Sequence, residues 1–245
     1  MALDILTKEE NLLKNLAVVK SKVADGKLCV ALNANAYGHG IVRVARLVEN
    51  AVDCFLVGED GDTALLKRHG IKKPIFVEKL AADAMRVPFC ISGNRECTDK
   101  SAKNGLSCDC LSVYGYPRGE LLPIMEVYSQ VLDVLNVPPY ASLGSCHVGR
   151  LGATVAIIQG GFSDGFGGDF IGSHMLINGK RYPVVAVFTN NTLLRVDDRV
   201  NTGDRVCVCG SSDRKIRYFD ELSREVGTDI RELMIRFGQG NDEKD

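Results

Sequence analysis

The stretch L-C-V-A-L-N-A-N-A-Y-G-H-G, residues 28–40, decides how the first half of the chain folds. Its first five residues, Leu28–Leu32, are apolar without alternation, which is typical of a strand buried on both faces. Gly38 and Gly40 then supply the conformational freedom that a tight turn requires. Apolar residues at helical spacing follow in the segment Val42–Val48. The stretch therefore predicts a buried strand that passes directly into a helix.

The same alternation of strand and helix extends outward from this stretch over the first half of the chain. A helix precedes it, and Thr7 and Glu10 have the spacing of a capping box at its start. Cys54–Val57 and Ile75–Val77 are further apolar strand segments, separated by a helical pattern that ends near Gly70. Alternating strands and helices with short links predict a parallel sheet with covering helices.

The second half of the chain has a different pattern. From Ile124 onward, short runs rich in Val, Leu and Ile alternate with turn residues, which predicts a small antiparallel barrel or sandwich. The pair Asn178-Gly179 between two apolar runs is a strong signal for a two-residue hairpin. Asp220 and Thr228 are predicted to cap two short helices near the C-terminus.

Length and composition limit the class of protein. The 245 residues allow one large or two modest domains, and the change of pattern near Pro123 divides them into residues 1–120 and 121–245. A hydrophobic fraction of 45% with 25% charged residues excludes disordered and fibrous classes. The net charge of −1 argues against nucleic-acid and membrane-surface partners. Because Met1–Ala17 does not resemble a signal peptide and no membrane span is found, we expect a cytoplasmic protein.

The nine cysteines are an odd number and do not predict a disulfide framework. Two pairs, Cys108-X-Cys110 and Cys207-X-Cys209, have the composition of soft metal ligands. Structural zinc sites usually have two residues between paired cysteines, and the second pair lies in an apolar strand pattern. We therefore interpret these cysteines as core residues and predict no metal site.

Residues 30–40, V-A-L-N-A-N-A-Y-G-H-G, resemble the pyridoxal-phosphate motif A-V-V-K-A-N-A-Y-G-H-G of the alanine racemase family. Four further segments resemble the family in the same order: residues 54–77, 110–116, 160–166 and 176–185. The resemblance implies the family fold, an eight-stranded α/β barrel followed by a β-rich C-terminal domain. It also implies pyridoxal phosphate as cofactor, alanine racemisation for D-alanine biosynthesis, and a dimer in which one subunit completes the other's site.

The chain departs from the family motif where the chemistry takes place. Asn33 stands at the position of the lysine that forms the cofactor imine, and an amide cannot form one. Phe162 stands at the catalytic tyrosine and lacks its hydroxyl. Cys108 matches the arginine that faces the pyridine nitrogen, and residues 189–192 match the family's C-M-D-Q segment. The comparison predicts a pseudoenzyme with no intact catalytic residue.

Some cofactor-binding positions of the family are still recognisable. Tyr37, Cys110, Leu111 and, by a weak match, Ser92 are the positions that the resemblance assigns to pyridoxal-phosphate binding, and a covalent bond is not expected. The alternative is that Tyr37 and His39 only pack the turn after the strand. Both interpretations are open from the sequence alone.

The chain is short for the barrel that its motifs indicate. A complete barrel takes roughly 250 residues, whereas only about 120 precede the β-rich half, so about four strand–helix units are expected. The two exposed edges of such a partial barrel favour a homodimer or a heterodimer with a full-length racemase. An active racemase is the alternative, with Lys79 rather than Lys27 supplying the imine, and a decayed gene product is another.

Overall fold

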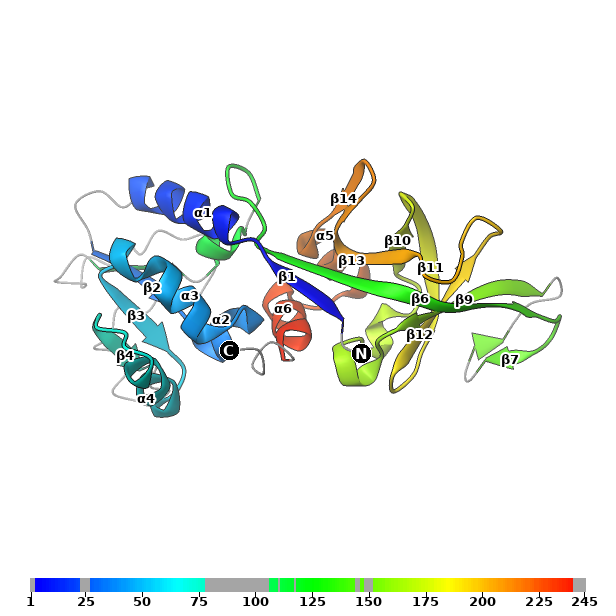
Figure 1. Ribbon diagram of the computed structural model, residues 1–245, viewed down its shortest axis with the longest axis horizontal. Helices are drawn as coiled ribbons and strands as arrows, with labels where there is room; N and C mark the ends of the chain where they lie inside the picture. The colour runs from blue at the N-terminus through cyan, green and yellow to red at the C-terminus, as the bar shows by residue number, and fades with distance from the viewer. Residues whose placement is uncertain are drawn as a thin grey trace. The chain divides into compact units, whose positions relative to one another are not determined.

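The computed structural model describes residues 3–22, 27–77, 106–109, 111–116, 118–143, 146–147 and 152–239. The chain divides into two units, Thr7–Ile124 and Met125–Asp245, and the second unit also includes Met1–Leu6. Figure 1 shows the helices and strands of each unit. No helix among the described residues is long and apolar enough to span a membrane.

The unit Thr7–Ile124 contains a four-stranded parallel sheet with the order β4-β3-β2-β5. Its strands are β2 (Lys27–Ala31), β3 (Cys54–Val57), β4 (Ile75–Val77) and β5 (Leu106–Asp109). The helices of this unit are α1 (Glu9–Lys22), α2 (Asn33–Gly38), α3 (Ile41–Val48) and α4 (Asp60–Arg68), with 3-10 turns η1 (Glu49–Ala51) and η3 (Ser112–Tyr114). The prediction of a parallel sheet with helices between its strands is confirmed.

Helix α1 is joined to a distant segment by one buried amide. The side chain of Asn15 donates hydrogen bonds to the carbonyls of Val113 and Leu122, and its Oδ1 accepts one from the Leu122 backbone. The predicted capping box at Thr7 is wrong, because Thr7 ends the strand β1 (Asp4–Thr7) and the helix begins at Glu9. The N-cap position is therefore Lys8, the residue directly before the helix, and not Thr7.

The second unit contains an eight-stranded sheet with the order β1-β6-β9-β12-β11-β10-β13-β14. After β1 come β6 (Met125–Val137), β9 (Ala153–Gln159), β10 (His174–Ile177), β11 (Lys180–Val187), β12 (Asn191–Val196), β13 (Arg205–Ser212) and β14 (Lys215–Arg217). An additional antiparallel pairing between β6 and β13 closes the strands from β6 to β13 in this order into a barrel. Of the two predicted architectures, barrel and sandwich, the structure forms the barrel.

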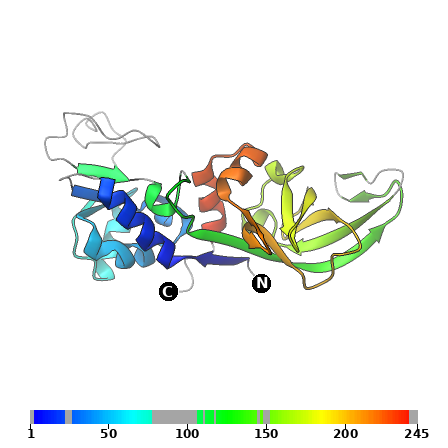
Figure 2. The same cartoon turned by 90° about the horizontal axis from the view of Figure 1, so that it is seen from above.

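Strand β6 is the longest of the sheet and forms a long ribbon with β9 (Figure 2). The predicted hairpin between β10 and β11 is confirmed: Asn178 and Gly179 form its turn, with φ of 48° and 69°. Positive φ at both residues is the type I′ geometry that matches the twist of the flanking strands. A two-stranded hairpin of β7 (Ser142–Leu143) and β8 (Cys146–His147) is separate from the sheet.

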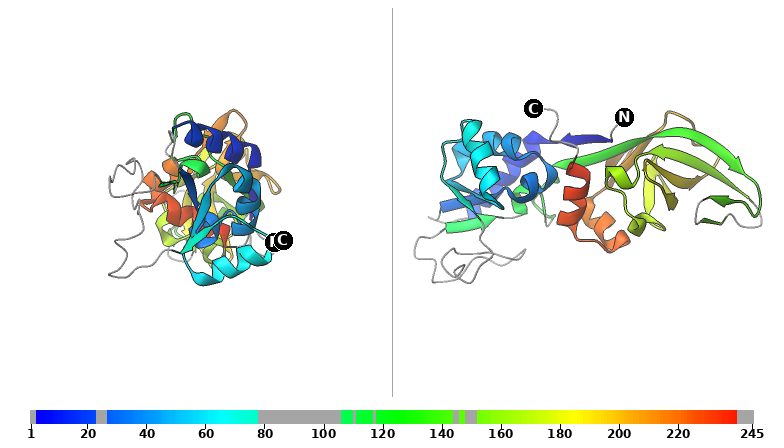
Figure 3. Two further views of the ribbon diagram at one scale, coloured as in Figure 1. Left: turned by 90° about the vertical axis from the view of Figure 1, so that its left-hand side faces the viewer. Right: turned by 90° about the horizontal axis from the view of Figure 1, so that it is seen from below.

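Two helices of this unit, α5 (Phe219–Val226) and α6 (Ile230–Gly238), follow the barrel strands in the chain and are orange to red in Figure 3. The predicted caps are wrong by one or two positions. Tyr218 precedes α5, and Asp220 lies in its first turn. Asp229 caps α6 by accepting from the Arg231 backbone, whereas the Thr228 hydroxyl donates to Asp169 at 2.6 Å. The carboxylate takes the cap position because it reaches the free N–H groups of the first turn.

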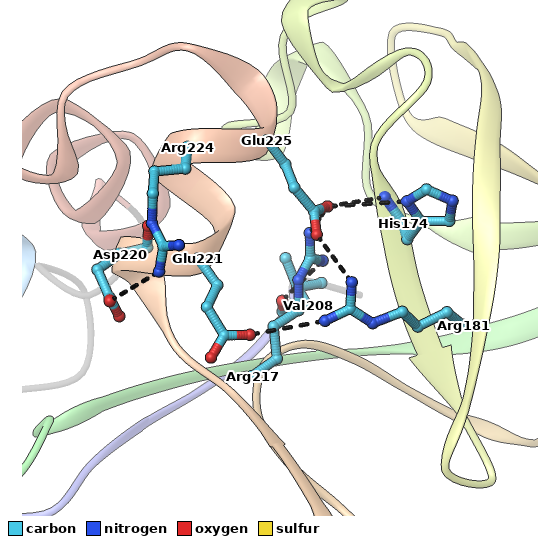
Figure 4. Close-up of polar contacts among 8 residues, drawn as sticks. All are labelled: His174, Arg181, Val208, Arg217, Asp220, Glu221, Arg224 and Glu225. Atoms are coloured by element: carbon cyan, nitrogen blue, oxygen red, sulfur yellow. Dashed lines mark hydrogen bonds and ion pairs between the residues drawn. The ribbon is translucent and has the colours of Figure 1, made fainter.

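Helix α5 is held by a cluster of ion pairs, shown in Figure 4. Glu225 accepts from the buried guanidinium of Arg217 at 2.5 Å, from Arg181 at 3.3 Å and from the His174 backbone at 3.2 Å. A surface pocket of about 450 Å³ lies over this cluster. Since its carboxylates and guanidinium groups are paired with one another, we interpret the cluster as structural.

Candidate functional site

The turn that follows β2, residues 33–40, is called here the first turn. Ala34, Asn35, Ala36 and Tyr37 all have φ near 50° and ψ between 41° and 55°. These angles make α2 a single turn of left-handed helix, a conformation that is unfavourable for L-residues by about 1–2 kcal/mol each. The glycine signal in the sequence predicted a tight turn here, but it did not predict its handedness. Such a strained turn persists only where its surroundings hold it.

Side-chain and backbone hydrogen bonds hold the first turn. The Asn35 side chain accepts from the Ile41 backbone at 2.6 Å, which caps the start of α3. The Asn35 carbonyl accepts from the Gly40 backbone at 3.1 Å. Asn tolerates the left-handed region better than most residues, so its place in this turn is chemically reasonable. The turn therefore fixes the direction in which the chain enters α3.

Three aromatic rings pack together beneath the turn. Tyr114 contacts Tyr37 edge-on, with ring centroids 5.2 Å apart, and His39, at 4.9 Å. All three side chains are buried. The Tyr114 hydroxyl donates to the Ala31 carbonyl at 2.6 Å, across 83 positions of sequence. We call Tyr37, His39 and Tyr114 the aromatic cluster.

His39 is neutral in this cluster. Its burial lowers the pKa to about 4, outweighing the hydrogen bonds to backbone carbonyls that favour the charged form. Nδ1 lies 2.8 Å from the Ala36 carbonyl, so Nδ1 carries the proton and Nε2 is left as an acceptor. Within the described part of the chain, Nε2 is buried with no hydrogen-bond partner. At neutral pH, Nε2 of His39 can therefore accept a hydrogen bond, but it carries no proton to donate.

The structure describes only some of the other positions singled out by the sequence. Asn33 is half-buried and is the first residue of α2, just beyond the carboxyl end of β2. The Leu111 carbonyl accepts from the Tyr114 and Tyr116 backbones, at 2.9 and 3.2 Å, and so holds the turn that carries Tyr114. Lys27 begins β2 and is therefore at the opposite end of this strand from Asn33. Ser92, Cys110 and Lys79 lie outside the described residues.

A second turn, residues 160–166, lies in the other unit and carries Phe162. It includes the 3-10 turn η4 (Phe162–Asp164), and a further 3-10 turn, η5 (Gly168–Phe170), follows it. The Phe162 backbone donates to the Phe188 carbonyl at 2.8 Å, and the Ser163 backbone donates to the Thr189 carbonyl at 2.9 Å. The structure thus places the turn that carries Phe162 next to the segment 189–192. Both Phe162 and this segment differ from the family motif.

The second turn is tightly packed around its glycines but exposes its phenylalanine. A Cβ atom on Gly161 would lie 2.1 Å from the Phe188 carbonyl oxygen, so only glycine fits there. The Phe162 side chain is 54% exposed, and the neighbouring Phe188 is 38% exposed. The turn therefore presents a hydrocarbon ring where the family motif would present a phenol.

Two family models match this chain, one over the part that carries the first turn and one over the part that carries the second turn. The family model for "Alanine racemase, N-terminal domain" matches residues 8–103, and that for "Alanine racemase, C-terminal domain" matches residues 124–243. The chain belongs to the alanine racemase family. The alanine racemase of Haemophilus influenzae is 42% identical over 83 residues, which are 34% of this chain and 23% of that protein. The alanine racemase of Pasteurella multocida is 41% identical over 63 residues, which are 26% of this chain and 18% of that protein. The matched segments thus span about a fifth of these relatives.

Solved racemase structures show the same fold at low identity. The alanine racemase from E. faecalis superposes with a TM-score of 0.81 and 14% identity, covering 96% of this chain and 95% of that chain. The alanine racemase of Clostridium difficile 630 gives a TM-score of 0.79 and 18% identity, covering 96% and 93%. At this identity the likeness supports the α/β barrel type with a β-rich C-terminal domain, which confirms the predicted fold class.

The described residues do not fit a covalently held pyridoxal phosphate, the cofactor of the alanine racemase family. Asn33 supplies an amide in place of an amine, and Lys27 is at the wrong end of β2. The aromatic cluster offers the Tyr37 ring, which packs edge-on against Tyr114, and the acceptor Nε2 of His39. An acceptor beneath the turn does not favour a phosphate, which itself accepts hydrogen bonds.

Several residues that shape the site have no local signal in the sequence. The hydrogen bond from Tyr114 to Ala31 and the packing of Tyr114 between Tyr37 and His39 depend on contacts between distant segments. The role of Asn35 as the cap of α3 had a local signal, because asparagine is a preferred capping residue. Asn35 lies six positions before Ile41 rather than directly at the helix start, so its sequence position does not indicate this contact.

Proposed function

We propose that this chain is a pseudoenzyme of the alanine racemase family, which does not interconvert L- and D-alanine. The observation that carries the proposal is Asn33, half-buried at the carboxyl end of β2, where the family motif has its lysine. Imine formation requires a primary amine with a free electron pair, and an amide nitrogen has none to donate. Without that bond the cofactor has no covalent attachment at this position.

The second turn supports the same conclusion independently. Racemisation requires a group that moves a proton on each face of the substrate carbon. Phe162 has no ionisable atom, so it cannot move a proton. Its side chain is 54% exposed. Restoring one group alone would therefore leave the reaction without its partner on the other face.

The test is a racemase assay on the purified full chain with added pyridoxal phosphate. We expect no conversion of L-alanine, no imine absorbance band and no adduct after borohydride reduction. A matched variant, Asn33→Lys, tests the position itself, because an imine band should appear there if the rest of the site admits the cofactor. Conversion by the unmodified chain, or a reduced adduct on Lys79 found by mass spectrometry, would overturn the proposal.

We also propose, as a second candidate function, that the chain associates with a full-length racemase subunit. Phe162 and Phe188 are exposed aromatic residues joined by a backbone hydrogen bond, and the resemblance assigns Phe162 to the tyrosine that reaches into a partner subunit in the family. Exposed aromatic residues are enriched at protein interfaces because they bury much area with few rotamers to fix. The support for this candidate function is thus the exposed pair Phe162 and Phe188.

Association is tested by sedimentation of the chain with a full-length alanine racemase at micromolar concentration. We expect a mixed species that Phe162→Asp abolishes. Ile216→Asp is the matched control, since Ile216 is similarly exposed, at 52%, but lies on β14. Independent sedimentation of the two proteins, or equal loss with the control variant, would count against this candidate. We further propose a reducing, cytoplasmic location, supported by the odd number of cysteines in the chain.

A further inference from the structure

The turn of the hairpin between β10 and β11 carries a chemically reactive pair, Asn178 followed by Gly179. Asparagine is one of the thermolabile residues, because the backbone nitrogen of the next residue can attack its side-chain amide. Glycine at that next position has no Cβ atom to hinder the attack. Asn178 is exposed, so the water that completes the reaction can reach it. The turn that directs the hairpin therefore also contains the groups for a covalent change.

We propose that Asn178 is a deamidation site, restrained by both ends of β13 while the barrel is intact. The Gly179 nitrogen forms a bond to Cγ of Asn178, the Cγ–Nδ2 bond breaks, and Nδ2 leaves as ammonia with the proton that the Gly179 nitrogen gives up. Water then opens the resulting cyclic imide and leaves either an aspartate or an isoaspartate at this position. No electron is transferred, and water is the co-reactant.

Two hydrogen bonds restrain the reacting atoms. The side-chain Nδ2 of Asn178 donates to Asp204 Oδ2 at 3.1 Å, and the Gly179 nitrogen donates to Ser212 Oγ at 3.1 Å. Asp204 directly precedes β13, and Ser212 is the last residue of this strand. The Gly179 nitrogen must leave Ser212 before it attacks, because its N–H group is engaged there. The closed barrel therefore slows the reaction, and opening at the ends of β13 releases it.

The product of the reaction no longer fits the contact with Asp204. A carboxylate at position 178 only accepts hydrogen bonds, whereas the Asn178 amide donates one to Asp204. Asp204 Oδ2 also accepts from the Asn201 backbone at 2.9 Å, so this carboxylate is held in place. Two carboxylates at hydrogen-bonding distance repel each other. Deamidation therefore replaces an attractive contact with a repulsive one.

The other side of the turn also carries negative charge. A Cβ atom on Gly179 would lie 3.1 Å from Asp213 Oδ2, so a second carboxylate borders the turn. The pairing of Ile177 with Val206 joins β10 to β13 directly beside the turn. We therefore expect the modified chain to open first where β10 and β13 meet.

The first experiment follows the full chain during incubation at mildly alkaline pH by peptide mass mapping, which detects the exchange of an amide for a carboxylate. Mapping is needed because a second Asn-Gly pair, Asn104-Gly105, is present outside the described residues. We expect slow conversion of Asn178, which Ser212→Ala accelerates about fivefold, the factor for one lost hydrogen bond. Ser211→Ala is the matched control, since Ser211 hydrogen-bonds to Tyr128. An intact Asn178, an unchanged rate in Ser212→Ala, or equal acceleration by Ser211→Ala would overturn the proposal.

The second experiment imitates the product and does not depend on the reaction rate. Asn178→Asp should lower the midpoint of denaturant unfolding, because it places a carboxylate beside Asp204. Aspartate, like asparagine, tolerates the positive φ of 48° at this position, so the variant tests the charge rather than the backbone. Asp204→Asn in the same chain restores a donor and an acceptor with their roles exchanged, and should recover most of the loss. An Asn178→Asp chain as stable as the unmodified one, or no recovery in the double variant, would contradict the repulsion.

Discussion

The first turn and the second turn come from different units, yet they differ from the family motif in the same way. In each, the residues that determine the backbone are kept: Gly38 and Gly40 in the first, Gly161 in the second. In each, the residue that would touch the substrate is changed. The first turn packs on buried aromatic rings, whereas the second exposes its ring to solvent. The difference shows that conformation and chemistry reside in separate residues and can be lost separately.

The largest effect is expected from Gly161→Ala, which breaks the packing of the second turn. The new Cβ would lie 2.1 Å from the Phe188 carbonyl oxygen and 2.7 Å from the Asn191 nitrogen, both of them backbone atoms. Because the backbone must shift, we expect a loss of roughly 3–4 kcal/mol in unfolding free energy. Denaturant titration measures the change. Gly168→Ala, where no atom lies within 4 Å, is the control and should change stability little.

The pH dependence of stability tests the first turn through His39. Its pKa is about 4 in the folded chain and about 6.5 in the unfolded chain, so the unfolded state binds more protons between these values. The contribution of about 3 kcal/mol is fully present above pH 6.5 and is lost as the pH falls toward 4. Denaturant titrations at a series of pH values should show this loss. His69→Gln should retain the dependence and His39→Gln should remove it; the reverse outcome would contradict the assignment.

A smaller effect is expected from Tyr114→Phe, which sharpens the comparison by removing one atom beneath the first turn. The Ala31 carbonyl would lose the hydrogen bond it accepts at 2.6 Å from the buried hydroxyl. The expected loss is about 1–2 kcal/mol, since a buried acceptor is left without that donor. Thermal unfolding measures it. A variant as stable as the unmodified chain would show that this bond contributes little to holding the turn.

The smallest effect is expected from Phe162→Tyr, which returns a phenol to the second turn. The ring is 54% exposed, so its new hydroxyl can be solvated and stability should change by less than about 0.5 kcal/mol. The variant should also remain without racemase activity, because Asn33 is unchanged. Stability is measured by denaturant titration beside the racemase assay. A marked loss of stability would mean that Phe162 packs in solution against something this chain alone does not show.

Features that depend on neighbours in sequence were predictable. The buried strand, predicted over Leu28–Leu32 and found at Lys27–Ala31, and the hairpin at Asn178-Gly179 both follow from local residue preferences. The handedness of the first turn was not predictable, because Ala34 and Ala36 have no preference for positive φ. The aromatic cluster was hidden for another reason, because it joins segments that are far apart in the chain.

The site was predictable only in part. The resemblance identified Asn33 and Phe162 as changed positions, and the structure places each on a well-defined turn. The caps at Thr7 and Asp220 were wrong, because the helices begin at Glu9 and Phe219 and the N-cap is the residue directly before each of them. The neutral state of His39 depends on burial, which sequence spacing does not reveal.

The placement of β1 has a consequence for how the chain is made. Asp4–Thr7 leaves the ribosome well before its partner strand β6, which begins only at Met125. At about 5–20 residues per second, roughly 6–24 s of synthesis separate the two strands. During that interval β1 has no partner strand, whereas helix α1, which follows it in the chain, can already form. The eight-stranded sheet can therefore be completed only after β6 has been synthesised, and β1 has no partner strand until then.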